Sequence, residues 1–175
     1  MAVAMPSPSP SLSLHTPVFR LLGQSDMEAL GALAAEIWQR HYPGIIPQAQ
    51  IDYMLARMYA PEVLRTQLAA GQTFWQLEKN GQACGFAAVE PRSDGRWFLH
   101  KCYIHPQHAR QGLGRALLAH IERTHRPQQL ALHVNRGNIQ AINFYFAQGF
   151  TIRGLSLTEI GGGFVMDDFE MMKQL

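Results

Sequence analysis

The sequence has little of several features that mark whole classes of protein. It contains two cysteines in 175 residues, which excludes the disulfide-dense frameworks of small secreted proteins. No apolar run approaches the 18 residues that a membrane-spanning helix needs, so we expect no membrane partner. Only 16% of the residues are charged, for a formal net charge of +2, while 47% are hydrophobic. These values are typical of an ordinary globular protein and not of a disordered chain.

The N-terminus also lacks the features of a targeting signal. Met1 to Pro17 is rich in serine and proline, with neither a basic start nor an apolar central region, so it is not a secretory signal. We predict a disordered leader over residues 1–17 and a single domain over residues 18–175. Cys84 and Cys102 fall within predicted strands, where we expect small buried hydrophobic side chains and no disulfide. These features favour a cytoplasmic location.

Two further partners are not expected. The basic residues form no stripe with interleaved aromatic side chains, so the pattern does not indicate nucleic-acid binding. His105 and His108 lie three residues apart, but no cysteine or carboxylate lies nearby at the spacing of a metal site. We therefore expect no metal.

Periodicity and turn signals divide residues 18–175 into alternating strands and helices. Asn80-Gly81 is a preferred dipeptide for a two-residue hairpin turn, and Gly161-Gly162-Gly163 marks a final hairpin. The pattern predicts a first strand followed by three helices and then three strands. A helix, a strand and a further helix come next, and two strands end the chain. The expected strands are 18–22, 73–77, 83–90, 97–104, 130–134, 150–159 and 164–172.

The most informative segment is His105 to Leu118, which follows the predicted strand 97–104 and opens an amphipathic helix. Gly112 and Gly114 let the backbone pass close to a ligand, and the N-terminus of a helix attracts anions. Arg110 and Arg115 flank this turn. We interpret the segment as a cradle for a pyrophosphate group.

Two common phosphate loops do not fit this segment. A P-loop needs a lysine and a serine or threonine after its last glycine, where this chain has Arg115-Ala116. A dinucleotide-binding fingerprint needs a small residue at Leu117 and an acidic residue about 20 positions later, and neither is present. The segment resembles the motif Gln/Arg-x-x-Gly-x-Gly/Ala of the GNAT superfamily of acetyl-CoA-dependent N-acyltransferases. Ala109 stands at its first position, which departs from the motif.

A second segment is similar to the other hallmark of that superfamily. The predicted strand 130–134 is followed by Asn138, Ala141, Phe144-Tyr145 and Gly149-Phe150, at the spacing of strand-x-Asn-x-x-Ala-x-x-Phe-Tyr-x-x-x-Gly-Phe. Asn138 suits a helix N-cap and Gly149 a left-handed stop. The resemblance covers residues 18 to 175.

The resemblance implies an α/β fold with a mixed, mostly antiparallel sheet, flanked by helices, whose central strands splay around the pantetheine arm of CoA. It implies acetyl-CoA as cosubstrate. The residues that it assigns to CoA binding are Tyr103, Ile104, Ala109, Arg110, Gln111, Gly112, Leu113, Gly114, Arg115, Asn138 and Tyr145.

The resemblance assigns Tyr145 to the departing thiolate. A phenol has an ordinary pKa of about 10 and a thiol of about 8.5, so complete proton transfer is uphill by about 2 kcal/mol. A strong hydrogen bond to the sulfur describes this role better. A packing tyrosine on an apolar helix is the alternative interpretation.

His100 is our candidate for the general base that deprotonates the amine, since an imidazole titrates near neutral pH. Related enzymes often carry a glutamate near this point. Period-two alternation puts His100, Cys102 and Ile104 on one face of the sheet and Lys101 and Tyr103 on the other. A purely structural histidine is equally compatible with the pattern, and Lys101 would serve as a base only if buried. We expect a backbone N–H near Tyr103 or Ile104 to stabilise the oxyanion.

Acceptor specificity in this superfamily comes from the first helices and the last hairpin. Carboxylates beside aromatic side chains suit a cationic amine there, and the candidates are Glu36, His41, Tyr42, Asp52, Tyr53, Tyr59, Asp167, Asp168 and Glu170. The final hairpin resembles that of polyamine and small-amine acetyltransferases.

The sequence therefore predicts an N-acetyltransferase that uses direct attack in a ternary complex on a small primary amine, such as a polyamine. A protein or peptide N-acetyltransferase is the alternative, and it needs an open groove between the second helix and the final hairpin. A non-catalytic acyl-CoA sensor is a third interpretation. An exposed strand edge offers a route to a homodimer.

Overall fold

The computed structural model describes residues 16–175. Residues 1–15 of the expected leader lie outside the described residues, and the division into leader and domain stays a prediction.

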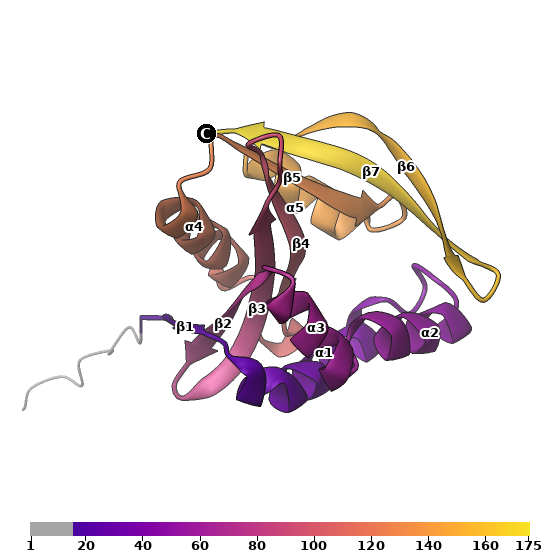
Figure 1. The fold of residues 1–175 in the computed structure, drawn as a ribbon, viewed down its shortest axis with the longest axis horizontal. Helices are drawn as coiled ribbons and strands as arrows, with labels where there is room; N and C mark the ends of the chain where they lie inside the picture. The colour runs from indigo at the N-terminus through magenta and orange to yellow at the C-terminus, as the bar shows by residue number, and fades with distance from the viewer. Residues whose placement is uncertain (1–15) are drawn as a thin grey trace, which may run out of the picture.

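A single mixed sheet of seven strands organises the described chain (Figure 1), in the spatial order β1-β2-β3-β4-β5-β7-β6. Neighbouring strands are antiparallel except for the parallel pair β4 and β5. The predicted fold class and element order are confirmed. The strands are β1 (Val18–Leu21), β2 (Thr73–Lys79), β3 (Gln82–Pro91), β4 (Trp97–Ile104), β5 (Gln129–Asn135), β6 (Thr151–Gly161) and β7 (Phe164–Gln174).

Helices cover both faces of the sheet and create two separate cores. On one face lie α1 (Met27–His41), α2 (Gln48–Met58) and α3 (Pro61–Ala69). On the other lie α4 (Leu113–His125) and α5 (Ile139–Ala147). Two short 3-10 turns, η1 (Gln24–Asp26) and η2 (Pro106–His108), precede α1 and α4. No helix within residues 16–175 is long and apolar enough to cross a membrane.

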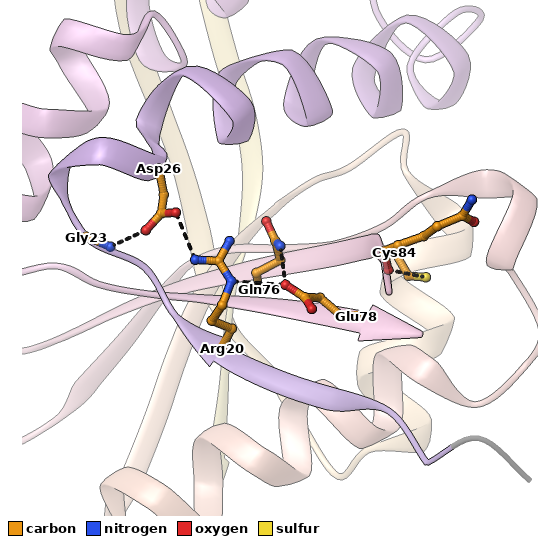
Figure 2. Close-up of polar contacts among 7 residues, drawn as sticks. Arg20, Gly23, Asp26, Gln76, Glu78 and Cys84 are labelled. Atoms are coloured by element: carbon orange, nitrogen blue, oxygen red, sulfur yellow. Dashed lines mark hydrogen bonds and ion pairs between the residues drawn. The ribbon is translucent and has the colours of Figure 1, made fainter. Parts of the chain in front are cut away.

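Polar contacts fix the edge strand β1 to its neighbours (Figure 2). The Arg20 guanidinium donates to Asp26 Oδ1 at 2.8 Å and to Glu78 Oε1 at 3.0 Å. Asp26 Oδ2 in turn accepts from the Gly23 amide at 2.7 Å. Arg20 therefore joins β1 to β2 and to the turn that begins α1.

The two central strands separate soon after they meet. β4 and β5 pair at three positions only, Trp97 with Leu130, Phe98 with Ala131 and Leu99 with Leu132. On its other edge, toward β3, β4 carries a bulge. Ala88 pairs with Lys101 and the next residue, Val89, pairs with Leu99, so His100 is an extra residue without a partner on β3. The predicted splay of the central strands begins at this point.

The bulge corrects one sequence expectation. Simple alternation put His100 on the same face as Cys102 and Ile104, and this is wrong. Leu99, Cys102 and Ile104 pack with α4 and α5, whereas the His100 ring lies against Phe98, its centroid 4.8 Å away, on the face opposite Leu99. One extra residue shifts the period-two pattern, so that His100 shares the face of Lys101 and Tyr103.

Close backbone approach between β3 and β4 generates a stability prediction. A Cβ atom on Gly85 would fall on the Tyr103 carbonyl oxygen and 2.6 Å from Ile104 Cδ1. We expect Gly85→Ala to lower the free energy of unfolding by about 1–3 kcal/mol, measured by urea denaturation. Gly23→Ala is the matched control, because its nearest neighbour is 3.9 Å away and its backbone is extended. An equal loss in both variants would contradict the steric explanation.

Candidate functional site

A cleft of about 1060 Å³ opens where β4 and β5 separate. Its volume is at the upper end of that of ligand pockets in proteins. The cleft collects, from β4, α4 and α5, nearly all site residues that the sequence predicts: His100, Tyr103, Ile104, Ala109, Arg110, Gly112, Leu113, Gly114, Arg115, Asn138 and Tyr145. Gln111 is the exception, since it is not among the lining residues and its side-chain oxygen accepts from Lys79 Nζ at 2.7 Å.

At one end of the cleft, the turn into α4 presents a run of free backbone amides. The Ala109 amide donates to the Pro106 carbonyl and the Ala116 amide to the Gly112 carbonyl. Among residues 16–175, the six amides from Arg110 to Arg115 donate no hydrogen bond to the protein. Free amides at a helix N-terminus form an anion-binding site, so the chemistry of this turn fits a pyrophosphate.

The conformation of the turn explains its glycines. Gly112 has φ of +74° with open space around it, so the backbone conformation, and not crowding, favours glycine there. Gly114 is crowded, because an added Cβ would lie 3.3 Å from Phe144. Gly114 therefore lets α4 pack closely on α5. Arg110 and Arg115 are exposed at the mouth of the cleft.

One backbone amide of β4 faces the gap between the parted strands. The His105 amide donates to the Cys84 carbonyl on β3 at 2.7 Å. Because successive residues of a strand direct their N–H groups to opposite edges, the Ile104 amide is directed away from β3. Of the two backbone positions that the sequence suggested for the oxyanion, the geometry favours Ile104 over Tyr103.

Tyr145 is buried and lines the cleft. Burial and the neighbouring Cys102 raise the pKa of its phenol well above the usual value. Burial also raises the pKa of the Cys102 thiol to about 12, and a hydrogen bond with the Tyr145 hydroxyl acts in the opposite direction. Both groups therefore stay protonated at neutral pH, and the Tyr145 hydroxyl is a hydrogen-bond donor beside a sulfur atom.

Asn138 connects α5 to α1, two helices on opposite faces of the sheet. Its Oδ1 caps α5 by accepting from the Ala141 amide at 3.2 Å, as the sequence predicts. Its Nδ2 lies 3.0 Å from His41 Nε2 at the end of α1. Burial lowers the pKa of His41, so the ring is neutral at pH 7 and its Nε2 accepts the hydrogen bond.

His100 lies in a charged network on the opposite side of the cleft. Its Nε2 is 3.2 Å from Glu90 Oε1, which also receives Arg92 Nη1 at 2.9 Å. Donation from Nε2 to Glu90 leaves Nδ1 as a free acceptor. Burial lowers the pKa of His100 and Glu90 opposes this shift, so the ring is neutral at pH 7 and can accept a proton.

Lys101 satisfies the burial condition that the sequence left open. Its side chain is 6% exposed, and its Nζ donates to Gln67 on α3 at 2.8 Å. The ammonium also lies over the Tyr59 and Phe74 rings. Burial lowers its pKa to about 8, so it remains mostly protonated at neutral pH and is a weaker candidate for the base than His100.

Among the acceptor candidates, the structure separates cleft residues from surface residues. His41, Tyr42, Tyr59 and Asp168 line the cleft. Asp52 instead accepts from Gln39 and Gln48, and Asp167 pairs with Arg136 at 3.0 Å. Glu36, Tyr53 and Glu170 also lie outside the cleft lining.

Asp168 is the candidate that sequence reasoning could not separate from its neighbours. It lies opposite Asn135 in the β5–β7 register and is 4% exposed. Burial, and to a smaller extent Asp167, raises its pKa from 3.8 to about 6. The sequence places Asp168 within the final strand, but only the register with β5 identifies the face on which it lies.

The final hairpin is held against α2 by two hydrogen bonds. Gln50 Nε2 donates to the Val165 carbonyl at 3.0 Å, and the Tyr53 hydroxyl donates to the Ile160 carbonyl at 2.7 Å. Figure 1 shows the tip of this hairpin, between β6 and β7, beside α2. A Cβ on Gly161 would meet the Tyr53 hydroxyl, and one on Gly162 would meet the Tyr53 ring. The groove between α2 and the hairpin is therefore bridged.

Comparisons with known proteins agree with this geometry. Residues 32–150 match the acetyltransferase (GNAT) family. The chain is 38% identical over 92 residues to a peptidyl-lysine N-acetyltransferase of Escherichia coli (strain K12), which covers 53% of this chain and 58% of that protein. It is 48% identical over 46 residues to a 5-NmdU N-acetyltransferase of Pseudomonas phage PaMx11, or 26% and 33% of the two chains. The matches thus span less than two thirds of either relative.

Among solved structures, the fold is similar to that of the PaiA N-acetyltransferase of Thermoplasma acidophilum in complex with coenzyme A. The TM-score is 0.78 at 23% identity, and the match covers 91% of this chain and 99% of the other. This likeness concerns the fold alone. Among residues 16–175, no group of three or more His, Cys, Asp or Glu side chains is arranged to hold a metal ion.

The buried carboxylate generates a pH prediction. Because the pKa of Asp168 is higher in the folded protein than in the unfolded chain, its contribution to stability is present below about pH 4 and is lost as the pH rises through 6. We expect Asp168→Asn to raise the free energy of unfolding at pH 7.5, by at most about 3 kcal/mol, and much less at pH 4.

Urea denaturation of both proteins at the two pH values checks this expectation. Asp167→Asn is the control, since that carboxylate is half exposed and ion-paired. The same difference between Asp168→Asn and wild type at both pH values would show that the carboxyl group does not titrate as expected.

Proposed function

Because the chain belongs to the GNAT family of acetyltransferases, we propose that it transfers an acetyl group from acetyl-CoA to the primary amine of a small molecule. The observation that carries the proposal is a single cleft that joins the free amides of the α4 turn to Tyr145 and His100. A donor-binding end and groups for proton chemistry thus share one cavity. In this proposal Gln111 contributes its backbone amide, since its side chain is held by Lys79, and Ala109 contributes no amide.

Binding of acetyl-CoA is assigned to the parted strands and the α4 turn. The six free amides from Arg110 to Arg115 donate hydrogen bonds to the pyrophosphate oxygens, and the guanidinium groups of Arg110 and Arg115 add positive charge at the mouth. The amide edge of β4 beyond Leu99 has no partner on β5, which leaves it available to the amide groups of the pantetheine arm. Ala109 already uses its amide for the preceding turn.

Deprotonation of the acceptor falls to His100 Nδ1, directly or through a water molecule. Glu90 holds the opposite ring nitrogen and so favours the tautomer with a free Nδ1. The neutral amine then attacks the thioester carbonyl. A C–N bond forms, the C–S bond breaks, and the negative charge on the carbonyl oxygen is stabilised by the Ile104 amide.

The departing thiolate receives a hydrogen bond from Tyr145. Burial raises the pKa of this phenol well above 10, so complete proton transfer to a thiolate is more unfavourable than for a free tyrosine. The Tyr145 hydroxyl therefore acts as a fixed donor that stabilises developing charge on sulfur.

The bridge between α2 and the final hairpin favours a small acceptor. A peptide substrate needs an open groove at this place, and Gln50 and Tyr53 close it through hydrogen bonds to the hairpin. The lysine side chain of a protein is the second candidate, because the relative at 38% identity is a peptidyl-lysine N-acetyltransferase.

We predict thiol release from acetyl-CoA in the presence of a small primary amine, and a kcat about 10²-fold lower in Tyr145→Phe with unchanged CoA affinity. The acceptor panel contains polyamines, amino acids, aminoglycosides and lysine peptides. Tyr59→Phe removes the hydroxyl of another buried tyrosine in the same cleft, and we expect it to change kcat much less than Tyr145→Phe.

The panel separates the competing interpretations. Turnover of lysine peptides alone would overturn the small-molecule proposal and favour the second candidate. Tight CoA binding without turnover of any amine would favour the sensor. If CoA does not bind, the assignment of the α4 turn fails.

The base is tested by the pH dependence of kcat at saturating amine. We expect kcat to decrease at low pH with a midpoint lower than pH 6.5, because burial lowers the pKa of His100. We expect His100→Gln to lower kcat by about 10²–10⁴-fold and to remove this acidic limb of the pH profile. His133→Gln, another cleft histidine with a lowered pKa, is the control. A limb near pH 8 that disappears in Lys101→Gln would instead identify Lys101 as the base.

A further inference from the structure

We infer that Asp168 binds the acceptor, and that it binds the acceptor as a primary alkylammonium ion. This inference rests on the proposed function and specifies its substrate class, since it names the charge state in which the amine enters the cleft. It concerns the acceptor end of the cleft, away from the free amides of the α4 turn.

The carboxylate of Asp168 faces the cleft from an otherwise buried residue and has no partner among the described residues. Its residue is 4% exposed, yet among residues 16–175 no side chain or backbone amide donates a hydrogen bond to its oxygens and no cation pairs with them. A buried ionised carboxylate without such partners is costly, and proteins normally pair or hydrogen-bond it. The arrangement is explained if the partner is a ligand.

The register of β7 directs this carboxylate to the cleft. Asp168 lies opposite Asn135, and both residues line the cavity. The preceding residue of β7, Asp167, lies outside the lining and holds Arg136 in an ion pair. Two adjacent aspartates thus occupy different environments, one paired at the surface and one open to the cavity.

The other groups around the cavity leave Asp168 as its single carboxylate. Among the described residues that line the cleft there is no second Asp or Glu. From α1 come Arg40 and His41, of which His41 is neutral. Tyr42, directly after α1, lies close enough for Asp168 to raise the pKa of its phenol. From β5 comes His133, and from the β3–β4 side come Arg92, His100 and Lys101. Arg92 is already paired with Glu90.

An alkylammonium ion suits these surroundings. Its N–H groups can donate to the Asp168 oxygens in a charge-assisted hydrogen bond. Its alkyl chain can pack against apolar and aromatic side chains of the same cavity, among which Met54, Met166 and Tyr42 come from α2, β7 and the C-cap of α1. The cation–π attraction of tyrosine rings adds to this binding. An uncharged acceptor gains none of the ionic contribution.

The test compares two ligands that differ in charge but little in size. Binding of n-butylammonium and of 1-butanol to CoA-saturated protein is measured by calorimetry at pH 7.5, together with CoA affinity. For wild type we expect n-butylammonium to bind at least 10-fold more tightly than 1-butanol, and this preference to disappear in Asp168→Asn. Asp167→Asn is the matched control and is expected to keep the preference.

The pH dependence provides a readout that a structural role would not affect. In wild type, ammonium affinity should fall as the pH is lowered through about 6, where Asp168 takes up a proton, and it should be flat over this range in Asp168→Asn. An ammonium preference that survives in Asp168→Asn, or is absent from wild type, would overturn the inference. Failure of CoA to bind, or of any amine to be acetylated, would instead contradict the proposed function.

Discussion

The rest of the structure depends on the early parting of β4 and β5. Three residue pairs hold these strands together before they separate, and the bulge at His100 changes the direction of β4 at the same point. Helices pack on both faces of the sheet, so the gap is bounded by two cores and forms a cleft within the molecule. Such a cleft exposes the backbone edge of β4, the end of α1 and the start of α4 together. Every group that the proposed mechanism uses reaches this one gap.

Much of this arrangement could be predicted from the sequence because it depends on local chemistry. Gly149 indicates a left-handed backbone at the end of α5, and Asn138 indicates the N-cap of the same helix. Each of these residues lies within a few positions of the helix end that it specifies. The spacing of the two motifs then identified the fold, and with it a mixed, mostly antiparallel sheet. Gln111 shows the limit of this reasoning, because a motif position fixes the backbone and leaves the side chain free to reach Lys79.

The features that could not be predicted depend on the register of strands that pair in the sheet but lie apart in the sequence. The face of His100 changed because of one extra residue opposite β3, and no local pattern reports a bulge. Asp167 and Asp168 are chemically identical neighbours in sequence, and only the alignment of β7 with β5 separates them. The burial of Lys101 depends on α3, which supplies Gln67. Long-range packing therefore decides the protonation states on which acceptor chemistry depends.

The bridge from α2 to the final hairpin has a consequence for how acceptor range can change through mutation. Both donors, Gln50 and Tyr53, reach main-chain carbonyl groups, and every residue at the accepting positions has such a group. Ile160 and Val165 can therefore be replaced without removal of either hydrogen bond. The closure of the cleft is robust to drift in the hairpin sequence, while side chains such as Met166 remain free to reshape the wall that an acceptor meets. New acceptors can be acquired on this scaffold without loss of the bridge that bounds the cleft.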